Sequence, residues 1–135
     1  GVRAVDGEGN VGAIRRGSMV TKVSYQDSGL EAEFLSACAG CHGSSSQGWT
    51  FAAMVNQAPD VACSGIPFLI DGTNPGTLGG TVSANTGDSK IYNKLNSTTP
   101  CDAGTQMPQS GAQWTTISGR MSLLSRWINQ GAENN

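Results

Sequence analysis

The pentapeptide Cys38-Ala39-Gly40-Cys41-His42 constrains this chain more than any other feature of its sequence. The spacing C-x-x-C-H is the attachment signature of c-type haem, in which two thiols bond to the two vinyl groups of a porphyrin. The adjacent imidazole then reaches the iron from the same side of the ring. One turn of helix supplies all three bonds, so we expect a fold built around one covalent haem c.

Two other kinds of site also use a C-x-x-C pair: a thiol redox centre and one half of a zinc site. A zinc site needs further Cys or His ligands at short spacing, whereas Cys63 and Cys101 stand alone and His42 is the only histidine. A thioredoxin-like pair follows a strand in a βαβ pattern, whereas the residues before Cys38 have a helical period. Haem attachment is therefore the favoured interpretation.

The two remaining cysteines, Cys63 and Cys101, are predicted to form a disulfide. Haem attachment of this kind takes place outside the cytoplasm, where disulfides also persist, so we expect a periplasmic or extracellular (cell-surface) location. The bridge would close a loop of about 39 residues and stabilise the fold by about 3 to 4 kcal/mol in the chain-entropy model. Two buried free thiols are the alternative.

The sixth ligand of the iron is a separate question. His42 is the only histidine, so one chain cannot supply two histidine ligands to the iron. Met107 is the strongest candidate, since it lies in an irregular segment between two expected helices and a proline follows it. Met54 and Met121 lie in apolar patterns typical of core packing, and Met19 belongs to a strand-like stretch. We therefore expect Met107 to bind the iron opposite His42.

This ligand pair has a consequence for function. A thioether with an imidazole favours reduced iron more than two imidazoles do, which raises the reduction potential, and two strong axial ligands leave no open position for a substrate. One-electron transfer is thus expected, and the protein is not expected to be an enzyme. If Met107 does not bind the iron, the open site would instead suit a haem enzyme or a gas sensor.

Three amphipathic helices are predicted, which makes the fold mainly α. The first follows Ser28, which has capping-box spacing with Glu31, and ends in the haem motif. The second spans about Ser89–Asn96, and the last spans about Thr115–Gln130. Their inward faces would carry Leu30, Phe34, Leu35, Cys38, Ile91, Tyr92, Leu95, Ile117, Met121, Leu124, Trp127 and Ile128.

Residues 43–87 form a long irregular region, rich in Gly, Ser, Asn and Pro, that would be unusual in a small domain without a group to wrap. Two apolar islands in it are expected to line the haem. Trp49–Val55 is predicted as a short helix and Ile66–Ile70 as an extended piece.

The first 27 residues differ from the rest in their sequence pattern, since they begin with a glycine-rich stretch of low apolar content. We therefore divide the chain into an N-terminal extended arm and strand, 1–27, and a haem domain, 28–135. Alternating side chains predict a short β-strand over Met19–Tyr25. The strand would pair with Ile66–Ile70 or add to a neighbouring molecule.

Length and charge narrow the remaining possibilities. The 135 residues suit one core, and the net charge of −2 gives no footprint for nucleic acid. No stretch approaches the roughly 18 to 20 apolar residues of a membrane span, and the start lacks the pattern of an export signal, so we take the chain as mature.

Candidate partners for the haem carboxylates are Trp49, Trp114, Arg15, Arg16, Lys90 and Arg120.

From about Ser28 to Ala132 the chain resembles the class I, single-haem c-type cytochromes. The likeness rests on the helix that ends in the C-x-x-C-H motif, on Met107-Pro108, and on a C-terminal amphipathic helix. It implies a cytochrome c-like helical fold in which the terminal helices cross near the haem, with His42 proximal and Met107 distal. It also implies an exported electron carrier that meets redox partner proteins. The arm over 1–27 departs from the minimal pattern and suggests an alternative, a structural subunit of a cytochrome filament or array.

Overall fold

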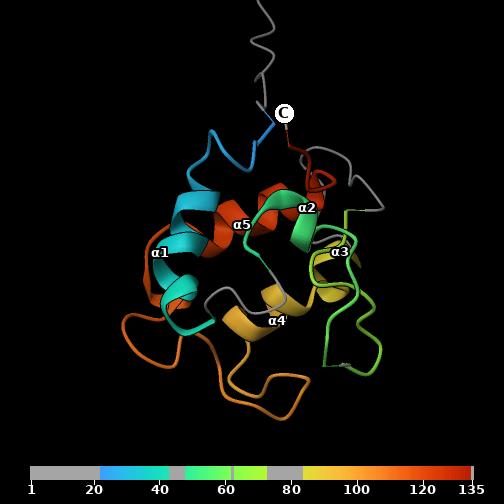
Figure 1. The fold of residues 1–135 in the computed structure, drawn as a ribbon, viewed down its shortest axis with the longest axis vertical. Helices are drawn as coiled ribbons and strands as arrows, with labels where there is room; N and C mark the ends of the chain where they lie inside the picture. The colour runs from blue at the N-terminus through green and yellow to red at the C-terminus, as the bar shows by residue number, and fades with distance from the viewer. Residues whose placement is uncertain (1–21, 43–47, 62, 73–83, 135) are drawn as a thin grey trace, which may run out of the picture.

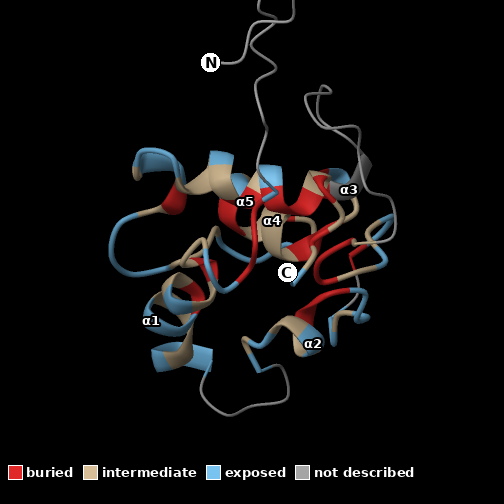
Figure 2. Ribbon diagram, turned by 90° about the horizontal axis from the view of Figure 1, so that it is seen from above, coloured by how far each residue is buried: buried red, intermediate tan, exposed pale blue. Residues whose placement is uncertain are grey.

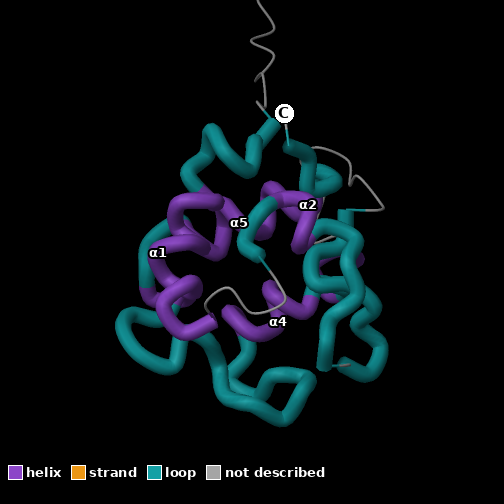
Figure 3. The backbone as a smooth tube through the Cα atoms, in the orientation of Figure 1, coloured by secondary structure: helices purple, strands orange, loops and turns teal. Residues whose placement is uncertain are grey.

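The chain is mainly helical, as predicted, in a computed structural model that describes residues 22–42, 48–61, 63–72 and 84–134 (Figure 1). Those ranges contain no strand, only isolated bridges between single residues (Figure 3). In the same ranges no helix is long and apolar enough to cross a membrane. The helices are α1 (Leu30–His42), α2 (Phe51–Met54), α3 (Ala84–Gly87), α4 (Lys90–Asn96), the 3₁₀ helix η1 (Trp114–Thr116) and α5 (Arg120–Asn129).

Helix α1 ends at His42, as the sequence predicts, but its start differs from the predicted capping box. Gly29, at φ 82°, precedes the helix, and its N–H donates to the carbonyl of Gln26. The Ser28 hydroxyl donates to the carbonyl of Tyr25, 3.4 Å away. A tight turn therefore leads into the helix, because only a glycine takes this backbone conformation without strain.

The predicted helix over Thr115–Gln130 is divided in two. Gly119 has φ 81° and forms the N-cap of α5, so the backbone cannot continue as one right-handed helix from η1. At the other end Gly131, with φ 100°, ends α5 as predicted, and the N–H of Ala132 donates to the carbonyl of Trp127 at 2.9 Å.

The predicted strand over Met19–Tyr25 is wrong for its described part, residues 22–25. The N–H of Val23 donates to the side-chain oxygen of Gln130 at 2.7 Å instead of joining a ladder. The following residues enter the turn before α1, and Tyr25 is fully buried. Residues 1–21, which hold most of the predicted arm and its expected role in self-assembly, lie outside the described residues.

Ile66–Ile70, predicted as an extended piece, contains no helix and pairs with two other segments through isolated bridges. Ile70 bridges Val55, and Phe68 bridges Ser89, both in parallel pairing. Residues 66–70 therefore lie between Val55, which follows α2, and Ser89, which precedes α4. Helix α2 falls within the short helix predicted at Trp49–Val55.

One aromatic cluster forms the centre of the core, and Figure 2 shows the buried residues gathered on the inner sides of the helices. Tyr25, Phe34, Trp114 and Trp127 are fully buried, and each ring lies within 6.3 Å of another ring of the cluster. Leu35, predicted to point inward, is 49% exposed, because it lies about 100° around α1 from Phe34. The other buried apolar residues are Val23, Leu30, Met54, Val55, Cys63, Leu69, Ile70, Leu95, Leu124, Ile128 and Ala132.

Candidate haem site

A cavity of about 560 Å³ lies against α1, α4 and the loop around Met107. All four residues predicted to hold haem, Cys38, Cys41, His42 and Met107, line it. The other lining residues are Phe34, Ala37, Trp49, Met54, Asp60, Val61, Leu69, Lys90, Ile91, Lys94, Leu95, Asp102, Pro108, Gln109 and Ser110.

The C-x-x-C-H motif forms the last turn and a half of α1. Residues three and four apart lie on one face of a helix, so Cys38 shares a face with Cys41 and His42. Cys38 is half-buried, whereas Cys41 and His42 are exposed. Both thiols are free, and burial, with a smaller effect of Cys41, raises the pKa of Cys38 to about 11. The His42 ring meets Trp49 edge to face, with centroids 5.8 Å apart.

Met107 is half-buried and reaches the cavity from an irregular loop, as the sequence predicts. Its N–H donates to the carbonyl of Lys94 in α4 at 2.8 Å. The neighbouring Gln106 side chain donates to the carbonyl of Leu95, also at 2.8 Å. Gln113 donates to the carbonyl of Pro108 on the other side. The backbone around the methionine is therefore fixed by side chains and carbonyls of other segments.

A second methionine, Met54, also lines the cavity. It is 1% exposed and belongs to the core, which agrees with its predicted packing role but adds a thioether to the wall. Met121 packs against the core as predicted, and Met19 lies outside the described residues. Among the three methionines in the described ranges, Met54 and Met107 are thus placed where a thioether could face a bound group.

The cavity has the size and the lining that are typical of cofactor sites. Its volume lies within the roughly 300 to 1,000 Å³ typical of cofactor sites, and Phe34, Leu69 and Leu95 give it apolar walls. Trp49 lines it with a buried indole N–H that has no partner among the described residues. Buried donors are nearly always satisfied, so this N–H suits an acceptor such as a haem carboxylate. The Tyr25 hydroxyl fixes this segment by donating to the Trp49 carbonyl at 2.7 Å.

The other candidate partners for the haem carboxylates separate clearly. Lys90 lines the cavity. Arg120 instead pairs with Glu33 and lies over the ring of Trp114, 5.6 Å from its centroid. The indole N–H of Trp114 is buried without a partner in the described part of the chain, behind Phe34. Arg15 and Arg16 fall outside the described residues.

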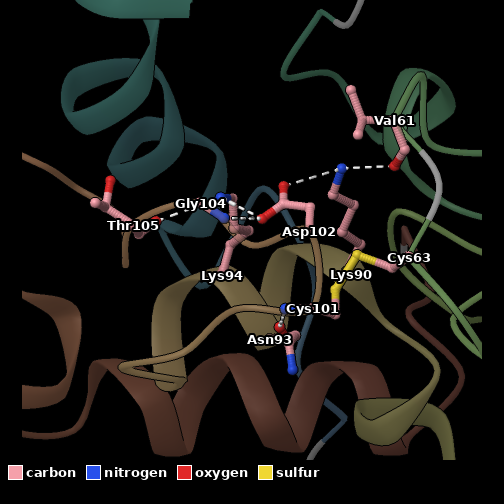
Figure 4. Close-up of a disulfide and its surroundings, with 9 residues drawn as sticks. All are labelled: Val61, Cys63, Lys90, Asn93, Lys94, Cys101, Asp102, Gly104 and Thr105. Atoms are coloured by element: carbon pink, nitrogen blue, oxygen red, sulfur yellow. Dashed lines mark hydrogen bonds and ion pairs between the residues drawn. A yellow bond between two sulfur atoms is a disulfide. The ribbon is translucent and has the colours of Figure 1, made fainter.

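A charged cluster on the cavity wall was not predicted from the sequence. Asp102 accepts a hydrogen bond from Lys94 at 2.7 Å and lies 3.4 Å from the ammonium of Lys90 (Figure 4). These three side chains are 11 to 17% exposed. The hydrogen bond from Lys94, aided by the Gly104 N–H, lowers the pKa of Asp102 to about 2 against the effect of burial. A lysine pair at i, i+4 beside Ile91 and Leu95 was the available signal for two of the three residues.

The predicted disulfide between Cys63 and Cys101 is confirmed, with Cα atoms 5.3 Å apart. The Cys101 N–H donates to the side-chain oxygen of Asn93 at 2.9 Å, which holds the bridge against α4. Figure 4 shows the ammonium of Lys90 directed toward Asp102 and the carbonyl of Val61, and not toward the bridge. The disulfide thus ties the loop before Ile66 to the segment that leads to Met107.

Metal binding by protein ligands alone has no support in the described ranges, where no three His, Cys, Asp or Glu side chains gather. A haem iron takes only its axial ligands from the protein, so His42 and Met107 do not need such a cluster. Comparison with protein-family models, curated proteins and solved structures finds no match for this chain.

Proposed function

We propose that this protein attaches one haem c through Cys38 and Cys41 and transfers single electrons, with His42 and Met107 as the axial ligands. One observation carries the proposal: the three residues of the C-x-x-C-H motif and Met107 line one cavity of about 560 Å³ although they are far apart in sequence. When bound, haem c supplies reversible one-electron chemistry between ferric and ferrous iron. This assignment makes the chain a cytochrome c-like protein.

The chain's own residues then have separate tasks. The two thiols of α1 would bond to the porphyrin, and a ring nitrogen of His42 would bind the iron from the same helix turn. Met107 would supply a thioether from a loop whose backbone is fixed to α4. Phe34, Leu69 and Leu95 would exclude water from the bound ring, which would lower the local dielectric and strengthen the effect of nearby charges on the iron.

We further propose that the protein works in an oxidising compartment, the periplasm or the cell surface. The disulfide between Cys63 and Cys101 supports this location, because such bridges persist outside the cytoplasm. The C-x-x-C-H motif ends α1, so we expect redox partner proteins to approach the haem edge at this end of the helix. Brief electron-transfer contacts need only small interfaces.

The test is the absorption spectrum of the oxidised protein, and in particular the weak near-infrared band that arises from sulfur bound to ferric haem. We expect the band in the native protein, its loss in Met107→Ala, and its retention in Met54→Leu. The Met54 variant is the matched control, since Met54 is the other methionine on the cavity wall. We also expect the double variant Cys38→Ala/Cys41→Ala to release its haem when the protein is denatured, whereas the native protein should retain it.

Other outcomes reassign the site. A band that survives in Met107→Ala but is lost in Met54→Leu would make Met54 the ligand. A native protein with covalent haem but without the band, whose ferrous form binds carbon monoxide tightly, would have an open sixth position. That result would replace electron transfer with ligand-binding chemistry.

A further inference from the structure

The segment from Cys101 to Met107 runs along α4 and is held by three consecutive residues of that helix. Asn93 accepts the N–H of Cys101, and the carbonyl of Lys94 accepts the N–H of Met107. The carbonyl of Leu95 accepts the side-chain amide of Gln106. These contacts fix the backbone at Met107 to one turn of α4.

Lys94 is the one residue of this group that contacts the segment at both ends. Its carbonyl binds Met107, and its ammonium donates to Asp102 at 2.7 Å and to the carbonyl of Thr105 at 3.3 Å. Asp102 in turn accepts the N–H of Gly104 at 3.1 Å. The side chain of Lys94 therefore closes residues 102–105 into a compact turn immediately before the proposed ligand (Figure 4).

The surroundings of the Lys94 ammonium make this contact stronger than a surface ion pair. The side chain of Lys94 is 17% exposed and that of Asp102 is 11% exposed, so solvent screens their attraction poorly. Gly104 leaves the space that the ammonium occupies, because a Cβ at that position would lie 2.6 Å from Nζ. A side chain at 104 would therefore displace the ammonium.

We propose that Lys94 is a positioning residue that holds Met107 in place to bind the haem iron. This inference rests on the proposed function, because it requires Met107 to be the sixth ligand. Lys94 acts through the turn at residues 102–105 and through its own carbonyl, and not by contact with the iron. Loosening that turn should allow an added ligand to replace the thioether more easily.

The test is the affinity of the ferric, haem-loaded protein for imidazole, which competes with Met107 for the iron. We expect Lys94→Leu to bind imidazole about tenfold more tightly than the native protein, because a charge-assisted hydrogen bond that holds the loop is lost. The near-infrared sulfur band should disappear at correspondingly lower imidazole concentration. Lys22→Leu is the matched control, since it breaks the exposed pair with Glu133 and should change the affinity less than about twofold.

Two further variants separate positioning from general stability. Gly104→Ala keeps Lys94 but displaces its ammonium, so it should raise the imidazole affinity in the same direction. Gly72→Ala puts a Cβ 2.8 Å from Val55 and 2.9 Å from the carbonyl of Gly131, which destabilises the fold without touching residues 101–107. It should leave the affinity unchanged.

Distinct results overturn the two ideas. If Met107→Ala raises the imidazole affinity but Lys94→Leu and Gly104→Ala behave like Lys22→Leu, the positioning role is wrong and the axial assignment stands. If Lys94→Leu and Gly72→Ala raise the affinity equally, the effect is one of stability and the positioning role is also wrong. If Met107→Ala leaves the affinity unchanged, both the axial assignment and the role of Lys94 fall.

Discussion

Glu33 of α1 and Arg120 of α5 form an ion pair that joins the helix carrying the C-x-x-C-H motif to the last helix of the chain. The Arg120 guanidinium also lies over the ring of Trp114, 5.6 Å from its centroid. The two side chains are only 28 and 36% exposed, so one arginine contributes to a charge contact and to an aromatic contact at the edge of the core.

Arg120→Ala should lower the free energy of unfolding by about 1 kcal/mol, because it removes both contacts. Lys22→Ala, which breaks a more exposed pair with Glu133, should cost less than about 0.5 kcal/mol. Urea denaturation of the haem-loaded proteins measures both values. Equal losses in the two variants would show that the contact with Trp114 adds nothing.

Removing the disulfide should have a larger effect. Replacing Cys63 and Cys101 together by serine should lower the free energy of unfolding by about 3 to 4 kcal/mol, because the unfolded chain gains the freedom of a 38-residue separation. Denaturation of the double variant, compared with the native protein, measures the loss. A change below about 1 kcal/mol would mean that contacts such as that of Cys101 with Asn93 hold the segment without the bridge.

Acid should weaken the fold through Asp102. Its pKa in the folded protein is lowered from the ordinary 3.8 to about 2, chiefly by the hydrogen bond from Lys94. A lowered pKa stabilises the folded state above about pH 4, and this contribution is lost as the pH falls toward 2. The difference in unfolding free energy between the native protein and Asp102→Asn should therefore be constant from pH 5 to 7 and shrink below pH 4. A difference that does not depend on pH would contradict this role.

Charge on the cavity wall should also set the reduction potential of the proposed haem. Lys90 lines the cavity and its side chain is only 11% exposed, so solvent screens its positive charge poorly from a group bound there. Positive charge disfavours ferric iron. Lys90→Gln should therefore lower the potential by on the order of 50 mV, whereas Lys22→Gln should leave it nearly unchanged. Spectroelectrochemical titration measures both, and a rise in Lys90→Gln would contradict the prediction.

Local sequence patterns predicted α1 and α4 closely, and a single glycine explains the main error in the last helix. Gly119 was visible in the sequence, but its φ of 81° depends on the turn between η1 and α5. The β-strand prediction was wrong for a similar reason: the N–H of Val23 donates to the side chain of Gln130, which is far away in the sequence. Ser89 is the N-cap residue of α4, but its hydroxyl accepts the N–H of Asp71 and no N–H of the helix.

The candidate site divides in the same way. The motif at the end of α1 and the loop methionine were predictable, because a covalent attachment sequence and a proline after Met107 are local signals. The charged cluster of Lys90, Lys94 and Asp102 was predictable only in part. The lysine pair at i, i+4 is a local signal, but the turn that brings residue 102 back beside α4 is not. Side chains that act across such a turn have no signature of spacing.

The aromatic cluster has an optical consequence. Trp114 and Trp127 are fully buried around Phe34 and Tyr25, and Trp49 lies on the wall of the cavity itself. Energy absorbed by an indole passes efficiently to a nearby haem, so the fluorescence of all three tryptophans should be quenched in the folded protein with haem bound. Unfolding would move Trp114 and Trp127 away from the porphyrin, whereas Trp49 stays within seven residues of His42. The fluorescence that then returns would report the fraction of molecules in which the aromatic cluster has come apart.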